Sequence, residues 1–301
     1  MQKPLPEAVL RITALTPRAF ATVLAVVCSF VAANLARGQT WTLTGANTNT
    51  YWTSVASSAD GTKLAATGNA GNGICLSTNS GVAWVTSSAP IVAWSSIASS
   101  SDGRRLIAAE GSVYISTNSG STWNLSIPTG NRVASSADGS KLMVAQASGY
   151  GSGIISISTN AGVSWFLGTN NGTTLSRSWS TIACSADGTR MAAVVNMDDC
   201  PVFVSTNCGV TWHLAPGIIG QPGAAIACTA DGSKLMLATA GMFYTSTSWG
   251  STWSSTNYNA PFGDSMASSA NGSTLMSVGF DSALDSSTNF GASWVSNNVP
   301  P

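Results

Sequence analysis

Charged residues are scarce in this sequence. Twelve Lys or Arg and twelve Asp or Glu make up 8% of the 301 residues, whereas soluble domains usually contain about 25%. The formal net charge is zero, so the chain lacks the basic surface with which proteins bind nucleic acid. His213, the single histidine, follows Trp212 in a strand-like stretch. The composition therefore excludes a strongly basic nucleic-acid-binding protein and gives no support to a Ser-His-Asp hydrolase.

Metal-binding patterns are absent as well. No Cys-x-x-Cys and no pair of histidines occurs, so we expect no metal site and no cofactor. Five cysteines follow residue 38, an odd number that leaves at least one thiol unpaired. A strand-like stretch separates Cys200 from Cys208 and spans about 25 Å when extended. That length is far beyond the reach of a disulfide, and we expect no bridge between them.

Long hydrophobic runs are missing except near the N terminus. Lys3, Arg11 and Arg18 precede an apolar run over residues 19–33, and Ala36 and Gly38 then place small residues at positions −3 and −1 of a cut after Gly38. A basic start, an apolar middle and a small-residue exit are typical of a secretory signal peptide. The alternative is a membrane anchor, but the run is shorter than the roughly 20 residues that a span needs. We therefore expect residues 1–38 to be removed, leaving residues 39–301 secreted, periplasmic or at the cell surface, without a membrane span.

An internal repeat dominates the rest of the sequence. Six segments carry Ser-Thr-x-x-Gly-x-x-Trp, and their tryptophans are 39, 42, 47, 41 and 41 residues apart. The segments are Ser77–Trp84, Ser116–Trp123, Ser158–Trp165, Ser205–Trp212, Ser246–Trp253 and Ser287–Trp294. Six further pairs alternate with them, namely Asp60-Gly61, Asp102-Gly103, Asp138-Gly139, Asp187-Gly188, Asp231-Gly232 and Asn271-Gly272. Each pair separates a Ser- and Ala-rich stretch from an apolar run.

Each repeat is predicted to form four short strands. Asp-Gly or Asn-Gly between two strand-like runs indicates a hairpin turn whose two central residues both take positive φ. The Ser-Thr-Asn-x-Gly segment then joins the third strand to the fourth, with Asn bonding to nearby backbone amides and Gly taking positive φ. The structural turn residues are Asn79, Gly81, Asn118, Gly120, Asn160, Gly162, Asn207, Gly209, Gly250, Asn289 and Gly291. About 41 residues in four strands is the size of one propeller blade.

We predict an all-β fold, a single β-propeller of six four-stranded blades whose first strands lie nearest the axis. Trp41 stands before the first repeat, so residues 40–44 have the pattern of an additional fourth strand. These residues either cover an outer edge or compete with residues 292–296 to close the ring. A seven-bladed ring is the alternative, although three of its strands are lacking.

The repeat resembles the Asp-box, also called the bacterial neuraminidase repeat, Ser-x-Asp-x-Gly-x-Thr-Trp, over residues 41–297. Similar repeats occur in sialidases, in sortilin-type receptors and in photosystem II assembly-factor-like propellers. Asn replaces the family's Asp in five copies, and Ser248 replaces it in the other. Both replacements accept hydrogen bonds, so the turn is expected to persist without a charge or metal role. In the family the box is a structural turn far from any active centre, so the resemblance implies a fold and no chemistry.

The order of the hairpins divides the predicted ring into two faces. Turns between the first and second strands and between the third and fourth strands share one side, the turn face. The other connections vary in length and share the opposite side, the loop face, where we expect functional residues. Sialidases grip a carboxylate with three arginines, but only Arg132 and Arg177 are expected on the loop face. We predict no catalytic residues; a divergent glycoside hydrolase drawing on Asp198, Asp199, Asp264, Asp281 or Glu110 is an alternative.

The loop face also supplies a candidate ligand site. Trp52, Trp94 and Trp179 start the first strand of blades one, two and four, where the other blades have glycine. Their rings would stack on a sugar or peptide at the mouth of the axial channel, and the added polar groups would be Arg132, Arg177, Asp198 and Asp199. The alternative is that these tryptophans pack between blades.

Two cysteines hold a position that is serine in the other four blades. We interpret Cys184 and Cys228 as small buried residues rather than redox partners. Taken together, the sequence predicts a monomeric, non-catalytic module that binds or scaffolds a glycan or protein. A structural component of the cell surface or envelope is the remaining alternative.

Overall fold

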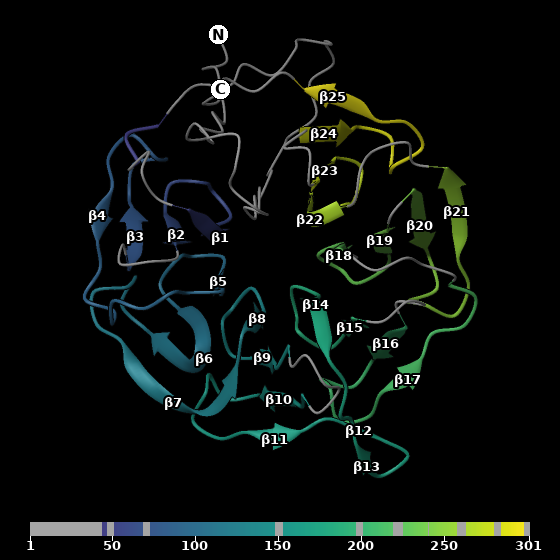
Figure 1. Cartoon of the computed structure of the whole chain (residues 1–301), viewed down its shortest axis with the longest axis horizontal. Coiled ribbons are helices and arrows are strands. Elements are labelled where there is room, and N and C mark those ends of the chain that lie inside the picture. Colours follow the sequence, from purple (N-terminus) through teal and green to yellow (C-terminus); the bar gives the residue numbers. More distant parts are fainter. Residues whose placement is uncertain are drawn as a thin grey trace, which may run out of the picture.

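The computed structural model describes residues 44–46, 51–68, 73–147, 153–196, 201–218, 225–239, 241–257, 263–279 and 284–297. These residues form an all-β, six-bladed propeller of four-stranded antiparallel sheets, which confirms the predicted fold (Figure 1). Within these ranges, no helix is both long enough and apolar enough to cross a membrane. The expected signal peptide and residues 40–43 lie outside them.

The blades follow one another round the ring in chain order (Figure 1). Blade one consists of β1 (Trp52–Ser57), β2 (Leu64–Gly68), β3 (Ile74–Ser77) and β4 (Val85–Thr86). Blade two consists of β5 (Ser96–Ser99), β6 (Leu106–Ser116) and β7 (Asn124–Gly130). Blade three consists of β8 (Arg132–Ser135), β9 (Leu142–Ala145), β10 (Ile155–Ser158) and β11 (Phe166–Leu167). A small hairpin follows, formed by β12 (Thr169–Asn170) and β13 (Thr173–Thr174).

The second half of the ring repeats the same order. Blade four consists of β14 (Trp179–Cys184), β15 (Met191–Val195), β16 (Val202–Ser205) and β17 (His213–Leu214). Blade five consists of β18 (Ala225–Cys228), β19 (Leu235–Thr239), β20 (Met242–Ser246) and β21 (Ser254–Asn257). Blade six consists of β22 (Gly263–Ser268), β23 (Leu275–Gly279), β24 (Leu284–Ser287) and β25 (Val295–Asn297).

In blade two the single element β6 supplies both the second and the third strand. Its residues 106–109 pair with β5, and its residues 111–115 pair with β7. Gly111 lies between the two halves with a φ of 79°, a conformation that suits glycine. The chain therefore reverses within β6, and blade two keeps the layout of the others.

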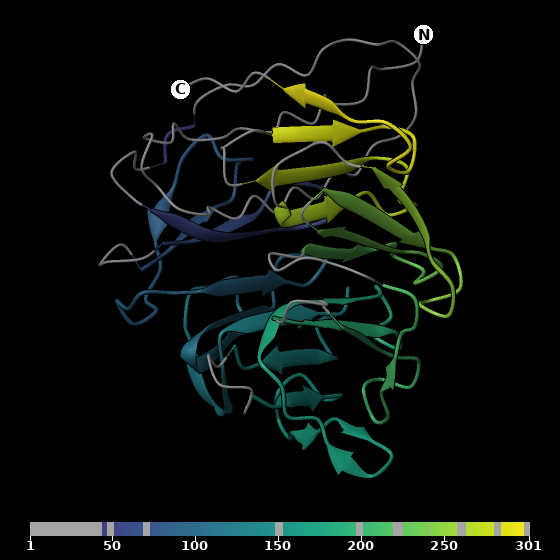
Figure 2. The same cartoon turned by 45° about the vertical axis from the view of Figure 1, so that its right-hand side comes forward.

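Burial changes from the axis outwards. Every residue of β15 and β19, which are second strands, is buried, because neighbouring blades cover both faces of the sheet (Figure 2). Such strands therefore read as unbroken apolar runs. The outermost strands β4 and β17 are exposed throughout. The first strands lie nearest the axis, as the sequence predicts (Figure 1).

One main-chain hydrogen bond joins neighbouring blades beside the axis. The Ala59 N–H donates to the Ser101 carbonyl at 2.8 Å, and the Ser101 N–H donates to the Ala137 carbonyl at 2.7 Å. The series continues with Ala137 to Ala186, Ala186 to Ala230 and Ala230 to Ala270. All six residues immediately precede the Asp or Asn of an Asp-Gly or Asn-Gly pair. We call this series of bonds, which runs from blade one to blade six, the girdle.

The turns before the fourth strands confirm the predicted Asn and Gly roles. The Asn118 Oδ1 accepts from the Thr122 N–H at 2.9 Å, and Gly120 has a φ of 84°. The structure adds a second left-handed residue that the sequence did not indicate, because Ser119 before this glycine has a φ of 58°. The corresponding residues in the other blades share this conformation, namely Ser80, Ala161, Cys208, Trp249 and Phe290.

The Asp-Gly turns differ from their prediction. In the first of them only Gly61 has positive φ. The Gly61 N–H donates to the Ser58 carbonyl at 3.0 Å, and the Ser58 N–H donates to the Lys63 carbonyl at 2.8 Å. The hairpin therefore has a four-residue loop rather than a two-residue turn. The carboxylate of Asp60 accepts from the Ser58 hydroxyl at 2.6 Å and from the Thr62 N–H at 3.0 Å, so Asp is selected as an acceptor and not for positive φ.

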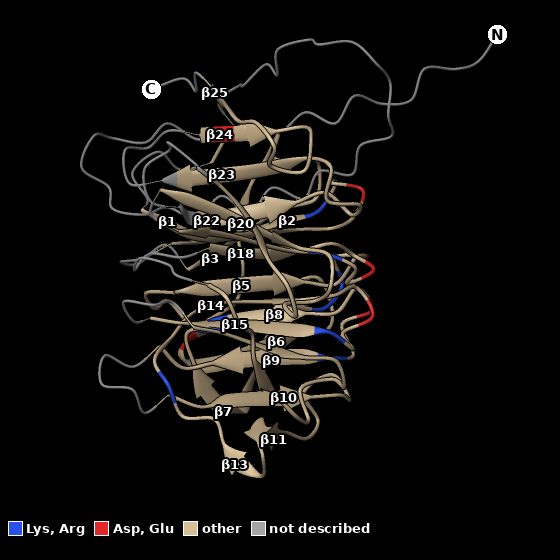
Figure 3. Ribbon diagram, turned by 90° about the vertical axis from the view of Figure 1, so that its right-hand side faces the viewer, with Lys and Arg blue, Asp and Glu red and all other residues tan. Residues whose placement is uncertain are grey.

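Both kinds of turn lie side by side, as predicted. The Ser119 N–H donates to the Arg104 carbonyl at 2.8 Å, which joins the two turns of blade two. Equivalent bonds occur in blades one, three, four and six. Figure 3 shows that Asp, Lys and Arg gather along this edge of the ring, which is the turn face.

The described part of the N-terminal segment, Thr44–Ala46, lies against blade one. A methyl group on Gly81 would be 3.7 Å from the Thr44 Cγ2, and Ala46 belongs to an apolar cluster with Trp52 and Cys75. The pairing of β24 with β25 shows that the last blade keeps its own fourth strand. How residues 40–44 take part in closing the ring stays a prediction, because only Thr44 of them is among the described residues.

Gly120→Ala is expected to destabilise the ring more than Gly111→Ala. Both glycines have similar positive φ, which strains an L-residue by about 1–2 kcal/mol. A Cβ on Gly120 would also lie 2.5 Å from the Leu76 Cδ1 of blade one, whereas a Cβ on Gly111 would have nothing within 4 Å. In urea denaturation we expect losses of about 1 kcal/mol for G111A and about 2–4 kcal/mol for G120A. Equal losses would show that this contact between blades adds nothing.

Candidate functional site

Bulges at the start of the first strands shape the loop face beside the axis. In β1, Trp52 pairs with Gly68 and Ser54 pairs with Thr67, which leaves Thr53 as the extra residue. In β14 the extra residue is Ser180. Bulges re-aim backbone groups and side chains, and here the Thr53 hydroxyl donates to the Trp94 carbonyl of blade two at 2.6 Å. The sequence carries no clear signal for these bulges.

Arg132 joins blades three and four at this level. Its Nε donates to the Ser180 carbonyl of β14 at 2.6 Å, and its NH1 donates to the Asn131 carbonyl at 3.0 Å. Burial is the cause that lowers the pKa of the Arg132 guanidinium from its ordinary value, although arginine remains charged in proteins. Both acceptors are neutral carbonyls. Among the described residues no carboxylate forms an ion pair with this cation.

Arg177 is the second predicted cation of the loop face. Its side chain is exposed, and its NH1 donates to the Ser176 carbonyl at 2.8 Å. It precedes β14 by two residues, so it approaches the blade that Arg132 also contacts. Asp198 and Asp199, the predicted acidic members of the site, lie outside the described residues. A ligand-binding role for these four residues stays a prediction.

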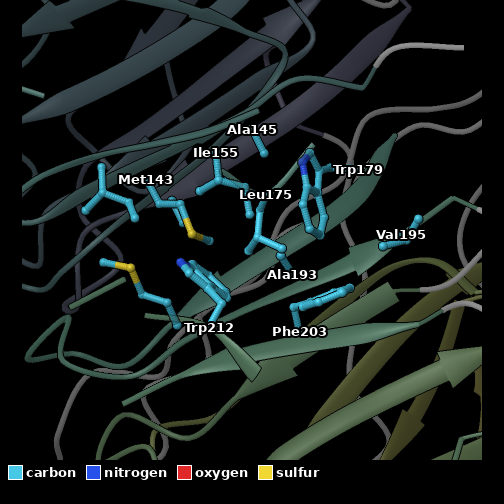
Figure 4. Close-up of a cluster of buried hydrophobic side chains, with 12 residues drawn as sticks. Met143, Ala145, Ile155, Leu175, Trp179, Ala193, Val195, Phe203 and Trp212 are labelled. Carbon is cyan, nitrogen blue, oxygen red and sulfur yellow. The ribbon is translucent and has the colours of Figure 1, made fainter. Parts of the chain in front are cut away.

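Trp52 and Trp179 start β1 and β14 as expected, and Trp94 lies two residues before β5, but all three are buried. Trp94 and Trp179 are 0% exposed and Trp52 is 8% exposed. The Trp179 indole donates to the Gly153 carbonyl at 3.0 Å, and its ring lies edge-on to Phe203 with centroids 5.8 Å apart. Figure 4 shows Trp179 and Phe203 within the apolar cluster of blades three and four. The expectation that these rings are open to a ligand is therefore wrong. Trp94 and Trp179 pack between blades, and Trp52 packs within blade one and against Ala46.

Tyr51 is an aromatic residue that the sequence analysis missed. It directly precedes Trp52 and is 49% exposed. Successive side chains in an extended chain point to opposite sides, so the burial of Trp52 turns Tyr51 outward. That alternation was the signal that could have identified it.

On the turn face, the aspartate side chains accept hydrogen bonds from hydroxyl groups and main-chain amides of their own turns. Each Asp of an Asp-Gly pair accepts from the hydroxyl two residues before it and from the amide two residues after it. These hydrogen bonds hold the pKa of each carboxyl group below its ordinary value, for Asp231 at about 2. In the part of the chain that the structure describes, no cluster of His, Cys, Asp or Glu could hold a metal ion.

Basic residues on the turn face reach from one blade to the next. The Lys63 Nζ donates to the Asp102 carbonyl at 2.9 Å, and the Arg190 NH1 donates to the Gly232 carbonyl at 3.1 Å. The Arg190 guanidinium also lies 5.6 Å from the centre of the Trp249 ring. These cations stabilise contacts between blades, which leaves Arg132 and Arg177 as the loop-face candidates for an external ligand.

Acid is expected to weaken the turns in a defined pH range. The five aspartates have lowered folded-state pKa values, so their stabilisation is complete above the unfolded-state pKa of about 4 and is lost as the pH falls toward about 2. Blade six has Asn271, whose Oδ1 accepts equivalent bonds without titrating. Asp231→Asn should therefore reduce the fall of the urea midpoint between pH 5 and pH 2 while changing it little at pH 7. An unaltered acid response would contradict this role.

Trp94→Ala is expected to destabilise the fold severely, because the ring is fully buried beside Tyr114 and Trp123. Removal of a buried Trp side chain costs about 3–5 kcal/mol. Tyr51→Ala is the comparison, and its exposed side chain should change the unfolding free energy by about 0.5 kcal/mol or less. A small loss in W94A, measured by urea denaturation, would show that the ring is not part of the core.

Comparisons with known proteins support the fold. No family model and no curated protein sequence matches the chain. Among solved structures, YCF48 from Cyanidioschyzon merolae has a TM-score of 0.60 at 11% identity, covering 82% of this chain and 84% of that one. YCF48 bound to D1 peptide has a TM-score of 0.59 at 12% identity, covering 81% of each chain.

An enzyme with a similar propeller is the GH74 xyloglucanase from Xanthomonas campestris, with a TM-score of 0.61 at 14% identity. The match covers 82% of this chain but 45% of the enzyme, so this chain spans less than half of that protein. At sequence identities this low, the comparisons show only that these proteins share a fold with this chain. The chain is thus a six-bladed β-propeller that structurally resembles YCF48 and the GH74 enzymes.

Proposed function

We propose that this chain is a non-catalytic binding module, exported from the cytoplasm, that holds an acidic protein segment on its loop face. The observation that carries the proposal is the half-buried Arg132 guanidinium, whose described partners are two neutral carbonyls. Arginine has five N–H donors, so this cation retains donors for a ligand. A carboxylate would supply the opposite charge that burial makes favourable.

The distribution of cations favours the same face. On the turn face Lys63 and Arg190 are bound to carbonyls of the next blade, and the aspartates there accept turn hydrogen bonds. On the loop face Arg177 is exposed and donates to the carbonyl of the residue before it. Arg104 of the turn face is also exposed, but its charge lies close to the carboxylate of Asp102. An acidic segment would therefore be attracted more strongly to Arg132 and Arg177, beside blades three and four.

A similar fold bound to a peptide gives this proposal a precedent. The structure described as YCF48 bound to D1 peptide contains a propeller that superposes on 81% of this chain. We extend peptide binding to this chain as a monomeric scaffold, with residues 1–38 as its export signal.

Glycan binding is the second candidate, favoured by the exposed ring of Tyr51 and by the GH74 likeness. Sugar sites commonly use aromatic faces, but Trp52, Trp94 and Trp179 are buried and supply none. A glycosidase would also need two carboxylates about 5–9 Å apart. Of the acidic residues considered for such a site, only Glu110 has a described side chain.

Arg177→Ala is expected to weaken the binding of acidic peptides, because it removes an exposed cation from the loop face. Fluorescence anisotropy with extended Asp- and Glu-rich peptides, each compared with its Asn- and Gln-substituted counterpart, would measure the effect. We expect about fivefold to tenfold weaker binding, or about 1–1.4 kcal/mol, and a strong dependence on salt. Arg132→Gln should act in the same direction.

Arg104→Ala is the matched control, since Arg104 is an exposed arginine of the turn face. It should leave the affinity unchanged. Equal weakening by R104A and R177A would show a general charge effect and would contradict a loop-face site. Preference for neutral oligosaccharides over every acidic peptide, lost in Tyr51→Ala, would favour the glycan candidate instead.

A further inference from the structure

A small hairpin interrupts the connection between blades three and four. Its strands β12 and β13 pair over two residues each, which leaves Asn171 and Gly172 as a two-residue loop. Both loop residues have positive φ, 49° and 76°, as in the type I′ turn that favours Asn-Gly. The hairpin lies at the outer rim of the ring, where β13 is farther from the axis than β11 and β17 (Figure 1). It therefore stands outside the six blades.

The polar groups of this loop are open to solvent. Asn171 and Gly172 are both exposed. Within the described residues, neither the Asn171 side chain nor the Gly172 N–H forms a hydrogen bond. An amide carbon and a main-chain nitrogen that can close a ring on each other therefore lie side by side in the chain, and no protein contact holds either of them.

A second Asn-Gly pair in the same chain provides a comparison. Three such pairs occur in the sequence, and Asn72 of one of them lies outside the described residues. The Asn271 Oδ1 accepts from the Ser269 hydroxyl at 2.9 Å and from the Ser273 N–H at 3.0 Å. The Gly272 N–H donates to the Ser269 carbonyl at 2.9 Å. The same dipeptide thus occurs once with both groups bonded and once with both groups open to solvent.

We propose that Asn171 is a modification site at which the chain deamidates itself, with water as the co-reactant. The Gly172 nitrogen attacks the Asn171 Cγ, and the new bond closes a five-membered succinimide ring. The side-chain nitrogen leaves with its bonding electrons and takes up the Gly172 proton, so ammonia is released. Water then opens the ring at either carbonyl, which gives aspartate or isoaspartate. One amide and one water become one carboxylic acid and one ammonia, without oxidation or reduction.

The rate of ring closure depends on how easily the loop opens, because Asn171 must rotate about its own backbone. A two-stranded hairpin is marginally stable, and β13 is exposed throughout. The Trp212 N–H donates to the Thr169 carbonyl at 2.9 Å, which anchors the base of the hairpin while its tip opens. The loop of Asn271 instead joins β22 to β23, so its opening disrupts a blade. Local opening should therefore cost much less free energy at Asn171.

The modification changes the charge of the hairpin without disturbing the ring. Residues 169–174 contain no charged side chain, so either product introduces a negative charge there. Isoaspartate also lengthens the main chain of the loop by one methylene group. Since the hairpin stands outside the six blades, the urea midpoint of the modified protein should equal that of the fresh protein.

The proposal can be tested by incubating the folded chain at mildly alkaline pH in water labelled with heavy oxygen. Digestion in ordinary water and tandem mass spectrometry then locate each deamidated residue, and only sites that reacted during the incubation carry the label. We expect Asn171 to react at least about tenfold faster than Asn271 in the folded chain. In the chain unfolded with guanidinium chloride, the two residues should react at similar rates, because neither loop is then protected.

Asn171→Gln is the matched control, because the longer side chain keeps the amide but cannot close the five-membered ring. In N171Q the labelled product at this position should disappear, and the slow reaction of Asn271 should be unaltered. Equal rates at Asn171 and Asn271 in the folded chain would overturn the proposal. So would a folded chain in which Asn171 stays intact while the unfolded chain reacts, or a labelled product at Asn170 in place of Asn171.

Discussion

The spacing of the blades at the axis depends on the girdle. The turns that follow the first strands of adjoining blades share one main-chain hydrogen bond, of 2.7–2.8 Å. Because the backbones are this close, only small residues fit beside them, which explains the Ser, Ala and Cys that end the first strands. Farther out the blades diverge, and larger side chains such as Met143, Phe203 and Trp212 fill the widening space (Figure 4).

The two faces of the ring follow from how their hydrogen bonds are satisfied. On the turn face, the hydroxyl, carboxylate and amide groups of Ser58, Asp60 and Thr62 bond to one another, and the same arrangement recurs round the ring. These bonds hold the turns in shape. On the loop face the connections differ from blade to blade, and Arg132 retains donors. The repeated turns of the turn face therefore serve folding, and the variable connections of the loop face are available for recognition of a ligand.

Much of the fold could be predicted from the sequence, because the turn signals are local and repeated. The turn at Asn118 and Gly120 could be predicted because it depends on properties of single residues. Asn has an acceptor side chain, and Gly tolerates positive φ. The loop of Asp60 was predicted incorrectly, since a two-residue and a four-residue hairpin share the Asp-Gly signal.

The candidate site was less accessible to sequence reasoning. The burial of Trp94 depends on Tyr114 and Trp123, and Arg132 finds its acceptor at a bulge 48 residues away. Such contacts between blades are tertiary, so the repeat pattern could place these residues at the axial mouth without showing what covers them. The contact of Cys228 with Cys184 is of the same kind.

The non-glycine residue of positive φ in each turn before a fourth strand has a consequence for how similar blades pack in the correct order. In three of the turns before a fourth strand, the side chain of this residue contacts the basic residue of the preceding blade: Ser119 contacts Lys63, Trp249 contacts Arg190 and Phe290 contacts Lys234. The Trp249 indole also donates to the Ser205 carbonyl of blade four at 3.0 Å. A chain of similar modules risks stacking the wrong neighbours as it folds. The position before the turn glycine varies in an otherwise constant turn. At the junctions of blades four and five and of blades five and six it is aromatic and contacts a cation, which distinguishes these two junctions from the others.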